Sequence, residues 1–110
     1  MNIRIMIISK LERNTNLVKD MIRDEELTVI GDSSTGAIAL DKLENISPDI
    51  VIMPLGAGDT DVFSLAERII SDRPRTHVIL LAESLDVGVL QNAIKIGAHN
   101  IIEFPKNIKE

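Results

Sequence analysis

Short apolar runs alternate with longer amphipathic stretches along this chain. The runs are rich in β-branched residues and fall at residues 3–8, 27–30, 49–53, 77–82 and 100–103. Runs of this length and composition are typical of strands that are buried on both faces in a parallel sheet. The sequence therefore predicts five strands.

The stretches between these runs have apolar residues at helical spacing, every three or four positions. They are centred on Leu17 and Met21, on Ala37, Leu40 and Leu43, on residues 62–70 and on residues 86–96. In the last of them, Leu90, Ala93, Ile94 and Gly97 are predicted to form the buried stripe. Gly31 and the Ser47-Pro48 pair fall in gaps and indicate turns.

Strict alternation of strand and helix predicts an α/β fold, because crossovers of this length join parallel strands through right-handed connections. The expected architecture is a doubly wound, five-stranded parallel sheet, with function at the carboxyl ends of its strands. Only six residues follow from Pro105 onward, so the fifth helix of such a fold is missing or truncated. We expect residues 1–110 to be a single domain that was excised from a longer chain, or whose uncovered sheet face is covered in a dimer.

Composition narrows the classes of function. The chain has 110 residues, no cysteine and a formal net charge of −5, which excludes disulfides, thiolate metal sites and thiol catalysis. Scattered lysine and arginine argue against a nucleic-acid interface, and the only aromatic residues, Phe63 and Phe104, cannot make a base-stacking platform. No apolar run reaches the roughly 18 residues of a membrane span. We expect a soluble, cytoplasmic domain that does not insert into a membrane.

Several segments carry a family resemblance. They are Gly-Asp-Ser-Ser-Thr-Gly at residues 31–36, Ser-Pro-Asp-Ile-Val-Ile-Met at residues 47–53, Ile-Gly-Ala at residues 96–98, Asn-Ile-Ile at residues 100–102, and Pro105. In this order and spacing the chain resembles a response-regulator receiver domain over residues 3–106. The resemblance implies a flavodoxin-like sheet of order 2-1-3-4-5 that switches a partner through aspartyl phosphorylation.

The chemical positions of that family are substituted here. Its magnesium-binding acidic pair falls on Ser9 and Lys10, and a hydroxyl and a cation cannot replace two carboxylate ligands. Its phosphoacceptor aspartate falls on Pro54, which has no nucleophile. Its switch hydroxyl, switch aromatic and phosphate-pairing lysine fall on Ala82, Ile101 and Phe104. The resemblance therefore implies a pseudo-receiver with no metal, no cofactor and no enzymatic activity.

Without that chemistry, binding is the function that remains. The first hypothesis is a phosphorylation-independent interaction or dimerisation module, active as a homodimer. Its expected apolar surface comprises Val87, Val89, Ile96, Ile102 and Phe104. The chain is most similar to the amino-terminal atypical receivers of TadZ/CpaE-type pilus-assembly proteins, which implies a downstream ATPase domain; a downstream output domain is equally compatible. The alternative is a regulatory receiver of a two-component response regulator, switched by a ligand or another non-phosphate signal.

Two further features at the carboxyl edge leave alternatives open. The Gly-Ala-Gly-Asp loop at residues 56–59 lies where nucleotide folds hold phosphate, but it lacks both glycine-rich nucleotide patterns, so a plain loop is the better interpretation. Acidic residues also gather near this edge: Asp32, Asp59, Asp61, Glu83 and Glu103. They suit a cation site or an enzyme built on Asp59, Glu83 and Glu103, although helix caps and solvated loops explain them more simply.

The two histidines and a small group of arginines can each be interpreted either as functional or as merely structural. His77 at the start of a strand and His99 in a turn are expected to be structural or solvated, since neither has a second metal ligand near it in sequence. Arg68, Arg73 and Arg75 surround the end of the third helix. They either contact an acidic partner or complement the carboxyl end of that helix.

Overall fold

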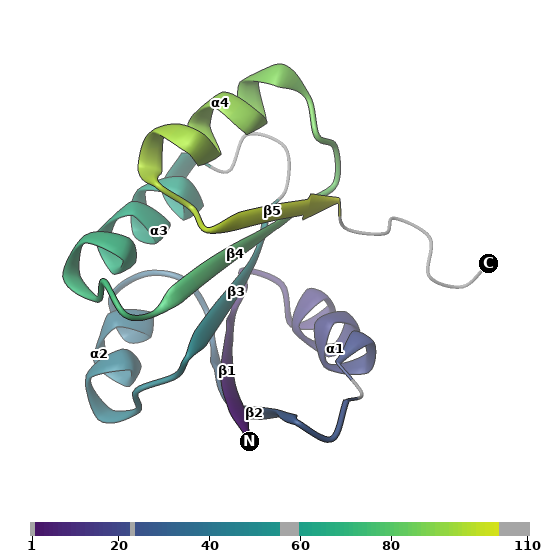
Figure 1. Cartoon of the computed structure of the whole chain (residues 1–110), viewed down its shortest axis with the longest axis vertical. Helices are drawn as coiled ribbons and strands as arrows, with labels where there is room; N and C mark the ends of the chain where they lie inside the picture. The colour runs from purple at the N-terminus through teal and green to yellow at the C-terminus, as the bar shows by residue number, and fades with distance from the viewer. Residues whose placement is uncertain (1, 23, 56–59, 104–110) are drawn as a thin grey trace.

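Five strands and four helices alternate in the part of the chain that the computed structural model describes, residues 2–22, 24–55 and 60–103 (Figure 1). The strands are β1 (Ile3–Ile8), β2 (Leu27–Ser33), β3 (Ile50–Leu55), β4 (His77–Ala82) and β5 (Asn100–Glu103). The helices are α1 (Glu12–Met21), α2 (Ala37–Asn45), α3 (Thr60–Asp72) and α4 (Val87–Ile96). All nine predicted elements are present. The predicted absence of a fifth helix concerns residues 104–110, which lie outside the described residues.

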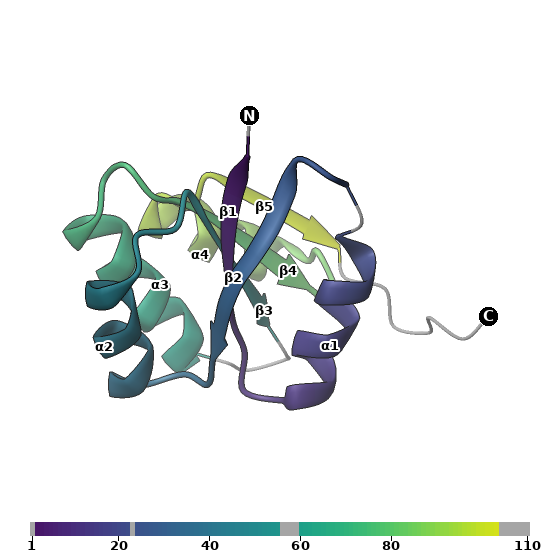
Figure 2. The same cartoon turned by 90° about the horizontal axis from the view of Figure 1, so that it is seen from below.

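The sheet is parallel throughout, in the order β2-β1-β3-β4-β5, as predicted. Helix α1 lies on one face, and α2, α3 and α4 lie on the other (Figures 1 and 2). The side chains of each central strand therefore alternate between two separate cores, one on the α1 side of the sheet and one on the α2–α4 side. Met6 and Ile8 of β1 point to the α2–α4 side, whereas Ile5 and Ile7 point to the α1 side.

The second strand is longer than predicted. Gly31 was expected to end it, but β2 continues to Ser33 through a bulge, since Ile5 pairs with Val29 and Met6 pairs with Gly31. A Cβ atom on Gly31 would lie 3.2 Å from the Ile46 side chain, so a larger residue would press on the end of α2. Glycine here permits close packing inside a strand and does not mark a turn.

The buried face of α4 differs from the predicted stripe. Ala93 is buried as expected, but the prediction is wrong for Leu90 and Ile94, whose exposed fractions are 37% and 77%. Val89 and Ile96 pack against the core in their place. Both sets of residues satisfy helical spacing around Ala93, so the sequence pattern alone does not choose between the two faces.

The ends of α4 are well specified. The Asp86 carboxylate accepts a hydrogen bond of 2.9 Å from the Val89 amide and so caps the start of the helix. At the other end, Gly97 has a left-handed backbone (φ 82°), and the amides of Gly97 and Ala98 donate hydrogen bonds to the carbonyls of Ile94 and Ala93.

Across the described residues, none of the helices is both long enough and apolar enough to cross a membrane.

Candidate functional site

The carboxyl ends of β1, β3 and β4 meet at one edge of the sheet, and most of the positions predicted to be substituted relative to the receiver family lie there. Ser9 and Lys10 directly follow β1, while Pro54 pairs with Leu81 near the end of β3 and β4. Ala82 is the last residue of β4 and is buried. The structure thus brings these four predicted positions to the same edge. Ile101 lies one strand further out, in β5, and packs against the α2–α4 core; Phe104 lies outside the described residues.

The Ser9 hydroxyl is engaged by the backbone of the turn that follows it. It donates a hydrogen bond to the carbonyl of Leu11 (3.0 Å) and accepts one from the amide of Leu11 (3.3 Å). Its own amide donates to the carbonyl of Ser33 in β2 (3.0 Å). Ser9 is only 4% exposed, and it joins β1 to α1 and β2. It therefore stabilises the turn and presents no carboxylate to a metal ion.

Lys10 forms an ion pair across this edge. Its Nζ lies 2.9 Å from Oδ1 of Asp61, in the first turn of α3. The hydrogen bond from Lys10 lowers the pKa of the Asp61 carboxyl below its usual range, and the charge of the ammonium acts in the same direction. Both side chains are solvent-accessible, so the pair contributes little to stability. Its chemical effect is local, because a metal ion approaching Asp61 must compete with a cation of the chain itself.

Pro54 is buried in β3, at the centre of the sheet. Proline lacks an amide donor and is normally excluded from central strands. It is accommodated here because the ladder between β1 and β3 runs from Ile5 and Ile50 to Ile7 and Ile52, so Pro54 lies beyond it. Its ring offers neither a nucleophile nor a metal ligand.

The acidic residues predicted near this edge do not converge. Asp32 pairs with Lys19 of α1 (2.8 Å), and Glu83 and Glu103 are exposed at the ends of β4 and β5. Among the described residues, no three acidic or histidine side chains are grouped so as to hold a metal ion. Asp59 and the rest of the glycine-containing loop lie outside the described residues.

A polar hollow of about 290 Å³ lies beside Ser9, between α1 and the end of β2. Side chains of both charges and several hydroxyls line it: Ser9, Lys10, Glu12, Thr15, Asn16, Lys19, Asp32, Ser33 and Ser34. Sequence reasoning did not find this hollow, because the Lys19–Asp32 pair that borders it joins residues on two separate elements.

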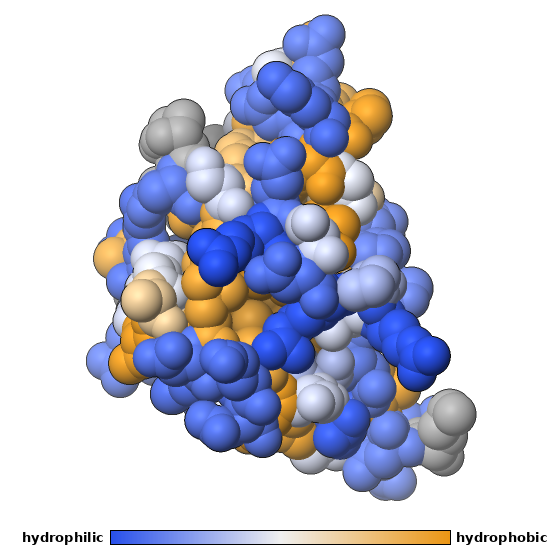
Figure 3. Space-filling view, turned by 90° about the vertical axis from the view of Figure 1, so that its left-hand side faces the viewer, coloured by the Kyte–Doolittle hydropathy of each residue, from blue (hydrophilic) through white to orange (hydrophobic). Residues whose placement is uncertain are grey.

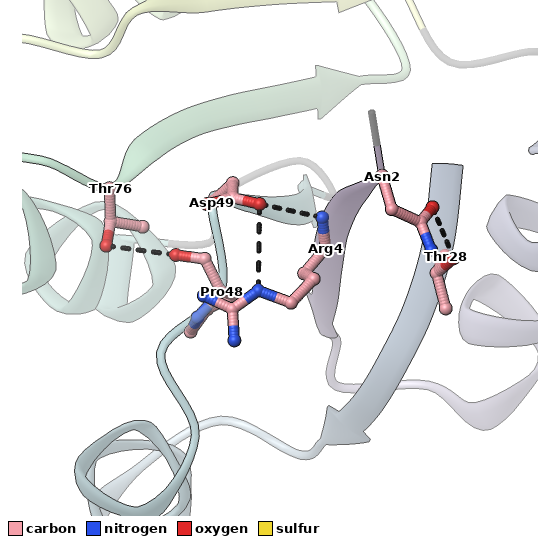
Figure 4. Close-up of polar contacts among 6 residues, drawn as sticks. All are labelled: Asn2, Arg4, Thr28, Pro48, Asp49 and Thr76. Carbon is pink, nitrogen blue, oxygen red and sulfur yellow. Dashed lines mark hydrogen bonds and ion pairs between the residues drawn. The ribbon is translucent and has the colours of Figure 1, made fainter. Parts of the chain in front are cut away.

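The opposite edge of the sheet is held by polar contacts between its strands (Figure 4). Asp49 accepts a hydrogen bond from the Arg4 amide (2.9 Å), and its carboxylate lies 3.7 Å from the Arg4 guanidinium. The buried Thr76 hydroxyl donates to the Pro48 carbonyl (3.4 Å). These contacts fix where β1, β3 and β4 begin.

The predicted basic group lies near this edge. Arg68 pairs with Asp72 within α3 (3.3 Å), as an ordinary helical i, i+4 pair. In the view from the side of α2 and α3, apolar atoms lie in a hollow framed by strongly hydrophilic side chains (Figure 3). Leu40 and Ile69 line the hollow between these helices, together with Glu44, Arg68, Asp72 and Arg73.

The predicted interaction surface is divided by the structure. Val87 and Ile102 are 69% and 45% exposed, whereas Val89 and Ile96 are partly buried against the core. Leu90 and Ile94, which the sequence placed in the core, are exposed beside Val87. We call Val87, Leu90 and Ile94 the α4 stripe, since their spacing places them on one face of the helix.

Comparison with known proteins agrees with the fold. The family description "Response regulator receiver domain" matches residues 5–110. A protein-glutamate methylesterase/protein-glutamine glutaminase of Methanospirillum hungatei is 29% identical over 110 residues, covering 97% of this chain and 32% of that protein. The chemotaxis protein CheY of Listeria monocytogenes is 23% identical and covers 94% of this chain and 87% of that protein. The chain thus spans about a third of the length of the methylesterase.

Solved structures show the same architecture. The response regulator domain of Thermotoga maritima CheB superposes with a TM-score of 0.81 at 21% identity, covering 96% of this chain and 81% of that one. A structure of Salmonella typhimurium RcsB gives a TM-score of 0.83 at 15% identity, covering 96% of this chain and 52% of that one. With the strand order and nearly the whole length matched, the chain belongs to the response-regulator receiver domain family.

Proposed function

We propose that this receiver domain acts in signal transduction without aspartyl phosphorylation, as a pseudo-receiver that binds another protein or a second copy of itself. The observation that carries the proposal is the buried Pro54 at the end of β3, where a receiver needs a carboxylate nucleophile. The domain itself has no enzymatic role in this proposal.

The surroundings of Pro54 support the same conclusion. Phosphorylation of a receiver requires a divalent cation, and Mg²⁺ is held by hard oxygen ligands such as carboxylates. Ser9 supplies a hydroxyl that is already engaged by the backbone, and Lys10 supplies a positive charge that pairs with Asp61. Both the nucleophile and the metal ligands are therefore replaced at one edge.

Treatment with a small-molecule phosphodonor and Mg²⁺ is expected to leave the intact mass of the protein unchanged, because Pro54 cannot form an acyl phosphate. Mass spectrometry at several times of incubation measures this directly. A receiver domain that carries the acceptor aspartate serves as the positive control. Stable addition of one phosphoryl group to the protein would contradict the proposal.

The α4 stripe is the surface we propose for protein contact. Three large aliphatic side chains lie exposed along one helix face. Exposed apolar patches of this kind commonly mark interaction sites in soluble proteins. We propose a homodimer as the first occupant of this surface.

Sedimentation equilibrium over a wide concentration range is expected to show a reversible dimer, and Ile94→Asp is expected to abolish it by burying an unpaired carboxylate in the contact. Ile38→Asp is the matched control, because Ile38 is also exposed (50%) but lies on α2. Equal loss of dimer in both variants would exclude the α4 stripe. A monomer at every concentration would exclude self-association and leave another protein as the occupant.

A regulatory receiver that is switched by a small ligand is the second candidate. The polar hollow beside Ser9 supports it, since both charges and several hydroxyls line a space of about 290 Å³ at the edge where receivers are switched. A ligand there would contact Lys19 and Asp32, which connect α1 to β2. Both candidates exclude phosphorylation. In the first the domain binds a protein through the α4 stripe, and in the second it changes state when a small ligand binds.

The setting of the domain is also proposed. We propose that it is joined to an output or ATPase domain, as in TadZ/CpaE-type pilus-assembly proteins, and that it works in the cytoplasm. In this proposal the domain contacts neither nucleic acid nor membrane lipid itself. The match to about a third of a longer methylesterase supports a multidomain setting, because such relatives carry a receiver as one part of their length.

A further inference from the structure

His99 bonds both backbone groups of a buried residue on the neighbouring strand. Its amide donates to the carbonyl of Val78 (3.0 Å), and its Nδ1 accepts the hydrogen bond of the Val78 amide (3.0 Å). The Val78 side chain is completely buried at the start of β4. The imidazole thus extends the ladder between β4 and β5 by one residue.

The conformation of the turn before His99 explains why a side chain, and not the backbone, accepts the hydrogen bond of the Val78 amide. Gly97 is left-handed and, with Ala98, completes the end of α4. The chain is therefore not extended before His99, and β5 begins only at Asn100. A backbone carbonyl that would normally accept the Val78 hydrogen bond is replaced by Nδ1 of the exposed His99 side chain, so the Val78 amide keeps an acceptor.

We propose that His99 is a pH-sensitive latch that holds the α4–β5 turn on β4. Accepting a hydrogen bond at Nδ1 requires the neutral imidazole with its proton on Nε2. Protonation of Nδ1 turns the acceptor into a donor that faces another donor, so the ring must leave Val78. Histidine is the side chain that commonly changes charge between about pH 5 and pH 8.

The charged neighbours of His99 do not compensate for protonation. The ring of His77 lies 4.4 Å from that of His99, so a proton on both places two cations side by side. Arg75 in the α3–β4 turn and Lys95 in the last turn of α4 are the nearest cationic residues along the adjoining segments, and Asp49 of the neighbouring strand is bound to Arg4. Within the described residues, no carboxylate forms an ion pair or hydrogen bond with His99.

Release of the latch acts on the turn between α4 and β5. The Val78 contact is the first bond between β4 and β5, and the same turn ends α4. Acidification should therefore loosen this corner while the centre of the sheet stays intact. The inference does not depend on the proposed function. Only one consequence rests on that proposal, namely that protein contact through the α4 stripe would depend on pH.

Amide hydrogen exchange of the full chain, measured by NMR from about pH 8 to about pH 5, tests the latch. After division by the intrinsic rate at each pH, the protection factors of the Val78 and His99 amides are expected to fall about tenfold or more on acidification. Val51 in central β3 serves as the internal reference and is expected to change little. Exchange is measured at a concentration where the protein is monomeric, so absence of a dimer does not affect the result.

His99→Asn is the matched variant, because asparagine places Oδ1 where histidine has Nδ1 and does not titrate. It is expected to keep Val78 protected and to show no fall with pH. The wild-type profile decides the question even if this variant folds poorly. Equal changes at Val78 and Val51 in the wild type, or the same fall in a folded His99→Asn protein, would overturn the proposal.

Discussion

Replacing Leu80 with alanine is expected to lower the free energy of unfolding by about 2–5 kcal/mol. Leu80 is completely buried in β4, where it pairs with Met53 of β3 and Ile101 of β5. It belongs to the core on the α2–α4 side of the sheet. Truncation removes apolar contact and leaves a cavity that a strand bonded on both sides cannot easily close. Urea denaturation followed by circular dichroism measures the loss.

Leu85→Ala is the control for this prediction. Leu85 is 38% exposed and precedes α4, outside the buried cores. The same chemical truncation is expected to cost about 0.5 kcal/mol or less there. Since a domain is stable by only about 5–15 kcal/mol, the two variants are readily separated. Similar losses at both positions would mean that the α2–α4 core does not carry the stability assigned to it.

Introducing a carboxylate at the proposed acceptor position by Pro54→Asp is expected to give no detectable phosphorylation. The new carboxylate would lack an acidic pair for the metal, because Ser9 is bonded to the Leu11 backbone and Lys10 holds Asp61. Intact-mass measurement after phosphodonor treatment with Mg²⁺ records the outcome.

Two further variants make this result interpretable. Pro54→Asn has nearly the same shape as Pro54→Asp but no charge, so it separates folding defects from chemical ones. The triple variant Ser9→Asp, Lys10→Asp, Pro54→Asp restores the metal ligands together with the nucleophile and is expected to bind Mg²⁺. Rapid phosphorylation of Pro54→Asp alone would show that the remaining residues of the edge still support the reaction.

The strands and their order were predictable because a parallel sheet buried on both faces requires continuous β-branched runs. The runs at residues 3–8, 77–82 and 100–103 match β1, β4 and β5. The end of β2 was not predictable, since Gly31 permits either a turn or a bulge. The buried face of α4 was predicted incorrectly for Leu90 and Ile94, because both faces of that helix are apolar.

The candidate site was predictable in position but not in its contacts. Ser9, Pro54 and Ala82 lie at or next to the carboxyl ends of strands, and parallel strands end at a common edge. The partners of these positions come from distant parts of the chain. Lys10 meets Asp61, and no local pattern indicates that a residue after β1 reaches the first turn of α3. The absence of a carboxylate at Ser9, Lys10 and Pro54 was thus visible in the sequence, while the ion pair of Lys10 with Asp61 was not.

Residue identities alone establish that this chain forms a receiver-like sheet and lacks a nucleophile at Pro54, because strand burial depends on local hydrophobicity and reactivity depends on functional groups. The use of His99 as an acceptor for Val78 and the exposure of the α4 stripe follow from the assembled fold. Both depend on which surfaces the turn after α4 brings against β4. Such packing is set by contacts between residues far apart in sequence, which periodicity and composition do not encode.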